Sequence, residues 1–316
     1  MNRPNITVII AAYNRGNILG ECLNSLLSQT ISNKSFNVII IDNNSTDNTQ
    51  EILSTFSRNW PQLKIITECK QGAGHARNTA LDIVTTEWVA CLDSDGKAHP
   101  DWIEKIISEI EKNSFDAFGG PYYAWHFFGP PPQWFPPEFG TYEAQQSYGL
   151  LQGDSYIPGG NCAFKLSTAK AVGGFPTDIG GMTGGKCLYG EETLMFNRMR
   201  EAGFRLGYVP DMKIDHCVLP YKYSFFWQMK SYLARGESNY QITFDHTKVL
   251  TTIISIGSRF IFSCGKLFIM LAYSLACGWH PQHRQNITKH ISRVVFYLGQ
   301  LKAACLQKLN PSSYDK

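Results

Sequence analysis

The sequence predicts an α/β protein with a doubly wound, mostly parallel sheet, followed by a C-terminal helical extension. Two observations carry this prediction. Short, continuously apolar segments alternate with amphipathic helical segments over the first hundred residues, which is typical of parallel strands covered by helices on both faces. After residue 240 the chain becomes basic and apolar, with the periodicity of helices.

The elements of the N-terminal part follow from its apolar runs and its turn residues. The second helix has the clearest start, because Ser45 and Thr46 precede it and Glu51 lies one turn inside. The predicted order is a strand at 5–13, a helix at 15–29, a strand at 36–45, a helix at 47–56, a strand at 63–68, a helix at 72–84 and a strand at 87–93.

Residues 119–160 are dense in proline, glycine and aromatic residues, with too little periodicity to predict a regular element. This segment is expected either to pack over a site as a wall for a ring-shaped substrate, or to be a structural connector. A strand and a helix are expected again before residue 175, then a helix from Glu191 and a strand at 204–210.

Two carboxylates, Asp93 and Asp95, follow the apolar strand Trp88 to Leu92. Held side by side they would repel each other, and a hard cation such as Mg²⁺ or Mn²⁺ would remove the conflict. Asp-Ser-Asp-Gly is equally good turn chemistry. A further acid, Asp42, lies at the end of another predicted strand. Acids at two separate strand ends favour the ligand site, because ligands of such sheets bind at the carboxyl ends of strands.

A second acidic pair, Glu191 and Glu192, begins a helix after a glycine-rich approach. Acids in a first helical turn are favoured by the helix dipole, but this position also suits a general base that faces a crevice. His216 lies on a later apolar segment, and a lone histidine is more often structural than a ligand.

Charge is distributed unevenly along the chain. The formal net charge of +3 divides into −6 over residues 1–220 and +9 over residues 221–316. A basic tail points to nucleic acid or an anionic membrane surface, and its apolar content favours the membrane. Nine cysteines without a close pair predict reduced thiols and a cytoplasmic location, as does the absence of a secretory signal pattern at the first residues.

The tail allows three arrangements. Residues 250–279 are strongly apolar, but Arg259 and Lys266 interrupt them, while a membrane-spanning helix needs about 20 apolar residues. Residues 287–305 place their apolar side chains on one helical face. The tail is therefore expected to lie on a membrane surface, to dock on the rest of the chain or on a second copy in a homodimer, or to span the membrane.

Taken together and in order, these motifs resemble the family 2 glycosyltransferases of GT-A fold, over residues 5 to about 240. The matching segments are "VIIAAYNR", "IIIDNNSTDNT", "GAGHARNTAL", "LDSDGKAHPDWI", "GGF" at 173–175 and "GEETLMFNRMREAGFRLGYVPDMKIDH". Many members have Glu-Asp where this chain has Glu191-Glu192, so either carboxylate is a candidate base and Glu192 is preferred.

The resemblance implies a metal-dependent, inverting transfer from a nucleotide-diphosphate sugar, with a UDP-sugar favoured. It assigns catalysis to Glu192 or Glu191 and the metal, Mg²⁺ or Mn²⁺, to Asp93, Asp95 and His216. The donor-binding residues it implies are Ala12, Tyr13, Asn14, Arg15, Asp42, Asn44, Gly74, Arg77, Asn78, Asp93 and Ser94. The acceptor-side residues are Trp125, Trp134, Gly160 and Asn161.

By the same resemblance the acceptor is a glycan or lipid-linked hydroxyl in surface polysaccharide biosynthesis, and the enzyme is cytoplasmic or peripheral on the cytoplasmic face of the inner membrane. Residues 1–240 would form the catalytic domain, with a nucleotide-sugar half at 1–118 and an acceptor-side half at 119–240, and 241–316 the tail. A nucleotidyltransferase or a non-catalytic sugar-nucleotide-binding protein of the same fold is the alternative. Only the tail charge suggests nucleic acid, and none is expected as a partner.

Overall fold

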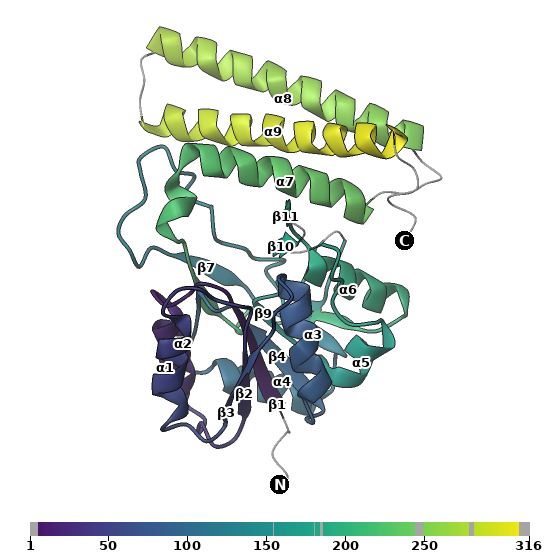
Figure 1. Cartoon of the computed structure of the whole chain (residues 1–316). Helices are drawn as coiled ribbons and strands as arrows, with labels where there is room; N and C mark the ends of the chain where they lie inside the picture. Colours follow the sequence, from purple (N-terminus) through teal and green to yellow (C-terminus); the bar gives the residue numbers. More distant parts are fainter. Residues whose placement is uncertain are drawn as a thin grey trace. The chain divides into compact units, whose positions relative to one another are not determined.

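A mixed eight-stranded sheet forms the centre of the first of two units into which the chain folds (Figure 1). The computed structural model describes residues 6–153, 155–179, 181–183, 186–243, 249–277 and 281–309. Unit 1 comprises Met1–Trp125, Gly140–Gly185 and Glu191–Cys217, and unit 2 comprises His126–Phe139, Lys186–Gly190 and Val218–Lys316.

The large sheet of unit 1 has the strand order β3-β2-β1-β4-β9-β6-β12-β8. The first four strands run parallel, β9 lies antiparallel between β4 and β6, and β12 is parallel to β6. The strands are β1 (Ile6–Ala12), β2 (Asn37–Asp42), β3 (Leu63–Thr67), β4 (Trp88–Leu92), β6 (Ala117–Gly119), β8 (Gly149–Leu150), β9 (Asn161–Lys165) and β12 (Leu206–Tyr208).

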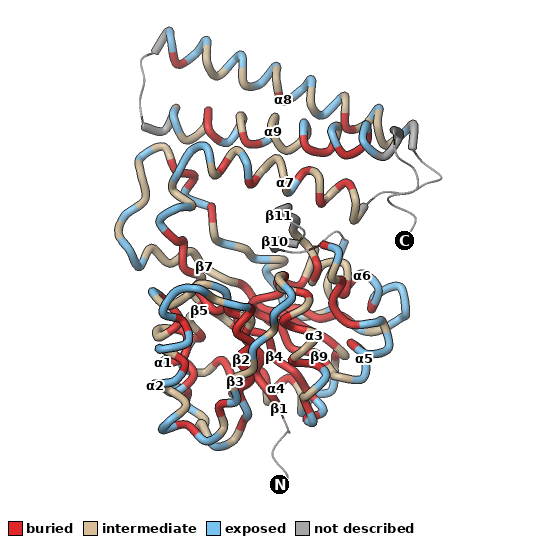
Figure 2. Tube along the Cα trace, viewed as in Figure 1, coloured by how far each residue is buried: buried red, intermediate tan, exposed pale blue. Residues whose placement is uncertain are grey.

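Helices cover both faces of this sheet, as the sequence predicts. Alternate residues of a strand point to opposite faces, so Val8 and Ile10 of β1 join the core beneath α1, α2 and α4, while Ile9 joins the core beneath α3, α5 and α6. The sheet and the inner helix faces are the buried part of unit 1 (Figure 2). The helices are α1 (Leu19–Leu27), α2 (Thr49–Ser57), α3 (Ala73–Ile83), α4 (Trp102–Lys112), α5 (Leu166–Ala171) and α6 (Glu191–Glu201).

A small sheet of three strands, in the order β5-β13-β7, also belongs to unit 1. It comprises β5 (Gly96–Ala98), β13 (Ile214–Cys217) and β7 (Tyr122–Trp125). The expectation of no regular element in residues 119–160 was wrong for β7 and for the short β8. β7 forms because a parallel partner, β13, pairs with it from a distant part of the chain, which local periodicity cannot reveal.

Unit 2 is built mainly from three helices, α7 (Phe225–Thr243), α8 (Val249–Cys277) and α9 (Pro281–Leu309), preceded by β11 (Lys186–Leu188) and the short helix η1 (Pro220–Tyr223). The helix α9 lies between α7 and α8 (Figure 1). Two glycines let α7 and α9 approach closely, because a Cβ at Gly236 would lie 2.0 Å from the Phe296 carbonyl oxygen and one at Gly299 would lie 2.1 Å from that of Leu233. The helical extension is thus confirmed, with α9 packed on α7 and α8.

The helix α7 continues across residue 240, where the sequence places the boundary between catalytic domain and tail. The compact units also assign residues 126–139 and 186–190 to unit 2. The division into a catalytic domain with two halves and a tail stays a prediction about how the chain folds and functions. The short strand β10 (Gly181–Thr183) completes the elements of unit 1.

Candidate active site

Three side chains that suit a metal ion converge in unit 1 at the end of β4. Asp93 and Asp95 follow this strand directly, and β13 pairs antiparallel with β5 so that His216 lies opposite Gly96. Ligand atoms of Asp93, Asp95 and His216 all lie within 4.8 Å of one another. The structure therefore brings together the three residues that the resemblance assigns to a metal.

The contacts of Asp95 hold this cluster together. One carboxylate oxygen lies 3.4 Å from Nε2 of His216, and the other lies 3.9 Å from Nε of Arg15. Its backbone carbonyl accepts a 2.8 Å hydrogen bond from the amide of Cys217. Asp95 is buried, with 5% of its surface exposed, whereas the carboxylate of Asp93 is about one-third exposed. Asp95 is therefore the more enclosed of the two acids.

The residues present fit a divalent cation. Two carboxylates and an imidazole are a donor set that suits Mn²⁺, and carboxylates also suit Mg²⁺. Nδ1 of His216 is buried and has no hydrogen-bond partner among the described residues. The other ring nitrogen, Nε2, lies 3.4 Å from Asp95 and is therefore the atom placed to bind an ion held by the two acids.

Arg77 joins the metal cluster to the acidic start of α6. Its guanidinium donates a 2.6 Å hydrogen bond to Glu191 and a 3.2 Å hydrogen bond to Asp93. Burial lowers the pKa of Arg77, but the negative charges of Glu191 and Asp93 raise it by more than burial lowers it. The guanidinium therefore stays protonated. Arg77 therefore fixes two carboxylates that are far apart in the sequence.

Glu192 lies next to this ion pair without taking part in it. Burial of its carboxyl, followed by the negative charge of Glu191, raises the pKa of Glu192 to about 8. A carboxylate that binds its proton near neutral pH is well matched to general base catalysis. The adjacent glutamates thus have different environments, since Glu191 is paired with Arg77 and Glu192 is not.

A turn of two glycines lies against both carboxylates. A Cβ at Gly160 would lie 2.0 Å from Oδ2 of Asp93, and a Cβ at Gly159 would lie 2.8 Å from Cγ of Glu192. The amide of Asp93 also donates to the Gly160 carbonyl at 3.3 Å. The backbone of this turn therefore sets the positions of Asp93 and Glu192, because a side chain at Gly160 would collide with Asp93 and one at Gly159 with Glu192.

The first predicted donor-binding segment follows β1. Ala12 is fully buried at the end of the strand, while Tyr13 is exposed and Asn14 has a left-handed backbone, with φ of 50°. The oxygen of the Asn14 side chain accepts a hydrogen bond from the amide of Thr46 at 2.8 Å, and Arg15 reaches Asp95. This loop is tied to the loop after β2, where the sequence places the second donor-binding segment.

In that second segment, Asp42 is fully buried and its carboxylate is already bound. It accepts hydrogen bonds from the amide of Ser45 at 3.1 Å and from the side chain of Gln50 at 2.8 Å. Asn44 is exposed, with φ of 62°. Asp42 therefore shapes the loop, whereas Asn44 lies on its surface.

Of the other donor-binding residues predicted on α3 and after β4, two contact the backbone of residues 175–176 and one is buried. Asn78 uses both its side-chain oxygen and its nitrogen on the backbone of Phe175, at 2.9 and 2.8 Å. Gly74 faces the carbonyl of Pro176 so closely that a Cβ would lie 2.2 Å from it. Ser94 is buried between the two aspartates in the sequence.

The predicted acceptor-side residues separate in the structure. Asn161 is fully buried, and its side chain accepts from Nε1 of Trp102 and donates to the carbonyls of Pro121 and Met212, each at 2.7 Å. Its amide oxygen and both amide hydrogens are thus engaged within unit 1, as suits a supporting residue. Trp125 ends β7, with the Lys97 ammonium 5.1 Å from its ring centroid. Trp134 belongs to unit 2, where it packs edge-on against Phe135 and Phe225.

Sequence reasoning missed a row of aromatic rings that leads to His216. Tyr122 lies 5.4 Å from the His216 ring, Tyr142 stacks on Tyr122 at 5.8 Å, and Tyr156 stacks on Tyr142 at 4.2 Å. It also missed Asn43, whose side chain binds the backbone of Glu68, Lys70 and Gly72 and so holds the turn before α3. The aromatic density of residues 119–160 was the available signal for the rings.

Relatives of known sequence match part of this chain. Glycosyltransferase AglE of Haloferax volcanii is 36% identical over 118 residues, which are 37% of this chain and 39% of AglE. The matched region is thus well under two thirds of that relative.

Among solved structures, the mannosyltransferase PcManGT from Pyrobaculum calidifontis, in complex with GDP-Man and Mn²⁺, has a TM-score of 0.61 at 18% identity, covering 98% of this chain and 88% of PcManGT. Residues 1–349 of TarS from S. aureus, in complex with UDP-GlcNAc, have a TM-score of 0.54 at 15% identity, covering 96% and 92%. These similarities show the GT-A fold. Residues 7–172 match the sequence profile of Glycosyl transferase family 2, about half of the chain, so the chain belongs to this family.

Proposed function

We propose that this protein transfers a sugar, with inversion, from a nucleotide-diphosphate sugar to a hydroxyl group of a glycan or lipid-linked acceptor. The observation that carries the proposal is the convergence of Asp93, Asp95, His216, Arg77 and Glu192 at the strand ends of a family 2 chain. Ligands of such sheets bind at this edge. The cluster supplies cation ligands, and a carboxyl group with a raised pKa lies next to it.

Transfer of a glycosyl group requires one bond to form, one to break and one proton to move. The acceptor oxygen attacks the anomeric carbon, the bond from that carbon to the diphosphate oxygen breaks, and the diphosphate leaves with the electron pair. Glu192, in its deprotonated form, accepts the proton of the acceptor hydroxyl, a contribution of about 10²- to 10⁴-fold. Attack from the side opposite the leaving group inverts the configuration.

The other residues of the site hold these groups in place. Arg77 fixes Glu191 and Asp93, so that α6 presents Glu192 at a defined position. Asp93, Asp95 and His216 would hold Mg²⁺ or Mn²⁺, and a bound cation would neutralise charge on the departing diphosphate as a Lewis acid. Tyr13 is exposed beside the loop of Asn14 and is available to stack on the nucleoside base.

The donor class is supported by the solved structures of similar fold, which hold GDP-Man in one case and UDP-GlcNAc in the other. A UDP-sugar remains our preferred donor. We place the protein in the cytoplasm, on the inner membrane surface where a lipid-linked acceptor would be found. Its role in surface polysaccharide assembly stays a prediction. A homodimer is the alternative use of the C-terminal helices.

A donor panel tests this proposal. The full chain is incubated with UDP-, GDP- and CMP-sugars, with Mn²⁺, with Mg²⁺ or with a chelator, and products are read by mass spectrometry. We expect slow release of a nucleoside diphosphate from one donor class, dependent on the metal. In a parallel reaction with a nucleoside triphosphate and a sugar 1-phosphate, formation of pyrophosphate would indicate a nucleotidyltransferase instead. Tight binding of a nucleotide sugar without turnover would indicate a non-catalytic protein.

Replacing Gly160 with alanine should weaken Mn²⁺ binding and lower the transfer rate by about 10-fold or more, because the new methyl group displaces the carboxylate of Asp93. Isothermal titration with Mn²⁺ and a rate assay measure the two effects. Gly20→Ala in α1 is the control, since nothing lies within 4 Å of a Cβ there. Equal behaviour of the two variants would show that the turn does not position Asp93.

A further inference from the structure

The hairpin of α8 and α9 in unit 2 has one sign of charge. Between residues 249 and 309 the sequence has seven lysines and arginines and no aspartate or glutamate. A surface of this kind attracts an anionic partner and repels a second copy of itself. The structure shows where on the hairpin the basic side chains lie.

The side of α8 that faces away from α9 is apolar and exposed. Small buried residues such as Ser263 and Ser274 lie on the opposite side of the helix, towards α9. The outer face of α8 consists of Ile254, Ile261, Phe262, Phe268, Ile269 and Leu275, which are 61% to 74% exposed. Figure 2 shows α8 as mostly exposed and intermediate. Exposed apolar patches of this size mark interaction sites.

The helix α8 is also the one segment among the described residues that is long and apolar enough to cross a membrane, over Thr251–Leu275. Arg259 and Lys266 lie within it, however, and it packs lengthwise on α9, which carries cations of its own. This arrangement suits a helix pair that lies along a membrane surface, with the outer face of α8 directed into the lipid.

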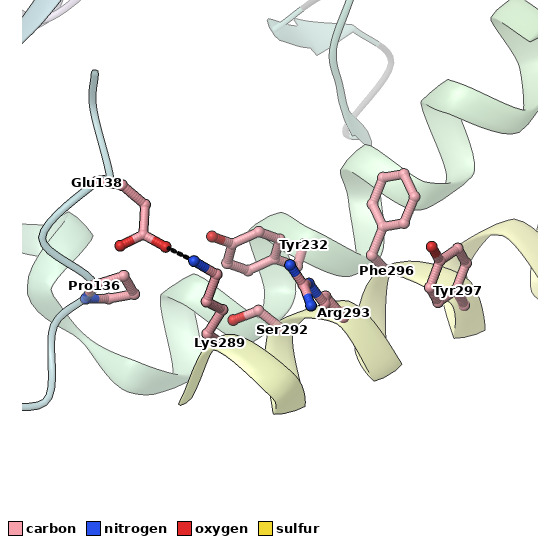
Figure 3. A pocket seen from close by; sticks show the side chains of 8 residues that line it. All are labelled: Pro136, Glu138, Tyr232, Lys289, Ser292, Arg293, Phe296 and Tyr297. Carbon is pink, nitrogen blue, oxygen red and sulfur yellow. Dashed lines mark ion pairs between the residues drawn. The ribbon is translucent and has the colours of Figure 1, made fainter. Parts of the chain in front are cut away.

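A cavity of about 210 Å³ lies beside this helix pair, between α7, α9 and residues 136–138. Lys289, Ser292 and Arg293 of α9 line it from one side and Tyr232 of α7 from another (Figure 3). Lys289 forms a 2.7 Å ion pair with Glu138, and both side chains are about half exposed. Arg293 forms no ion pair with any residue that the structure describes, so the cavity keeps an excess positive charge.

Lys266 of α8 adds a basic group beside the outer face. Its ammonium lies 4.4 Å from the ring centroid of Phe262 on the outer face. Burial of His290, followed by the charges of Arg293, Lys266 and Lys289, lowers the pKa of that histidine, so all three cations act on the same residue of α9. The hairpin therefore carries basic groups and apolar side chains, with no acidic residue of its own among them.

We propose that unit 2 binds the surface of a membrane that contains anionic phospholipid, with the outer face of α8 directed into the acyl-chain region and a phospholipid phosphate at Lys289 and Arg293 of α9. Arginine and lysine are the side chains that recognise phosphate. A free phosphate would leave the apolar face unexplained. A symmetric dimer through this face would bring the basic edges of two copies together.

This inference deepens the membrane contact proposed above and does not depend on the transfer reaction. Its test is flotation of the full chain with vesicles of phosphatidylcholine alone or with added phosphatidylglycerol, without a sugar donor. We expect binding only to the anionic vesicles, weakened by salt. Equal binding to neutral vesicles would overturn recognition of the phosphate, and so would the absence of any vesicle binding.

Two pairs of variants separate the pocket from general charge. Arg293→Gln should reduce partitioning about 10-fold or more, whereas Arg284→Gln, an exposed position of α9 outside the cavity, should reduce it roughly fivefold or less. Phe268→Ser on the outer face should abolish binding, and Leu306→Ser, exposed on α9, should not. Circular dichroism confirms that each variant is folded. Equal losses for both arginine variants would overturn the pocket.

Two further measurements address the other occupants. Inorganic phosphate is titrated against the wild type and Arg293→Gln, with thermal unfolding as the readout. Phosphate stabilisation that needs Arg293, without vesicle binding, would make the cavity a site for a soluble anion and overturn the lipid proposal. Light scattering gives the mass in solution, and a stable dimer that Phe268→Ser dissociates would assign the outer face to a second copy instead.

Discussion

Replacing Asp95 with asparagine should lower sugar transfer by about 10²- to 10³-fold and remove tight Mn²⁺ binding. The reason is that a bound cation is expected to stabilise the leaving diphosphate by several kcal/mol, and Asp95 lies between His216, a second candidate ligand, and Arg15. Asparagine is the better test than alanine. Asp95 is buried rather than exposed, so alanine would leave a cavity and confuse loss of metal with loss of fold.

The measurements are turnover with saturating donor, Mn²⁺ titration by calorimetry and the urea midpoint of unfolding. Asp215→Asn is the matched control, because Asp215 lies next to His216 on β13 but pairs with His99 at 3.4 Å, outside the cluster. We expect the control to keep its turnover and its Mn²⁺ affinity. An Asp95→Asn enzyme with near wild-type turnover in the presence of a chelator would refute the metal site.

Replacing Glu192 with glutamine should lower the turnover number by roughly 10² or more, with donor affinity almost unchanged. Glutamine keeps the size of the side chain but cannot accept the proton of the acceptor hydroxyl. The control is Glu201→Gln at the other end of the same helix, where the side chain is exposed. A mild effect of Glu192→Gln would remove the base from this position.

Glu191→Gln should behave differently, because this residue forms the buried ion pair with Arg77. Its loss leaves the guanidinium with Asp93 as its remaining partner, which should cost about 3 kcal/mol or less of unfolding free energy. The effect on turnover should be smaller than that of Glu192→Gln. The reverse ranking in turnover would move the base to Glu191.

The raised pKa of Glu192 also predicts how activity and stability depend on pH. The base must be deprotonated, so the rate with donor and acceptor should rise as pH increases towards about 8, and Glu192→Gln should lose this dependence. The stability of the folded state changes with pH in the opposite direction. An acid whose pKa is higher in the folded state costs stability as pH rises from its unfolded value near 4.5 to about 8.

The stability effect is measured without divalent metal, by urea unfolding of the wild type and Glu192→Gln at pH 5 and pH 8. We expect the variant to gain stability relative to the wild type as the pH rises. A constant difference between the two proteins across this range would show that the folded state does not raise the pKa of Glu192.

The sequence by itself was sufficient for the fold class and the family. Apolar runs of β1, β2 and β4 and the helices between them are recognisable because strand and helix periodicities are local properties of the chain. The positions of Asp93 and Asp95 after β4 follow from the same pattern. The acidic pair at residues 191 and 192 was also located correctly at a helix start.

Tertiary packing decided what these residues do for one another. Arg77 and Glu191 are 114 residues apart in the sequence. That Arg77 pairs with Glu191 rather than with Glu192 depends on how α3 and α6 pack on one face of the sheet. The proximity of His216 to Asp95 requires β13 to pair with β5, and the turn at Gly160 fits Asp93 only after β9 joins β4. Such contacts join residues distant in sequence and depend on shape and burial, which local patterns do not encode. The exposed face of α8 was decided in the same way, because only the packing of α9 on α7 and α8 determines which apolar side chains of α8 remain outside.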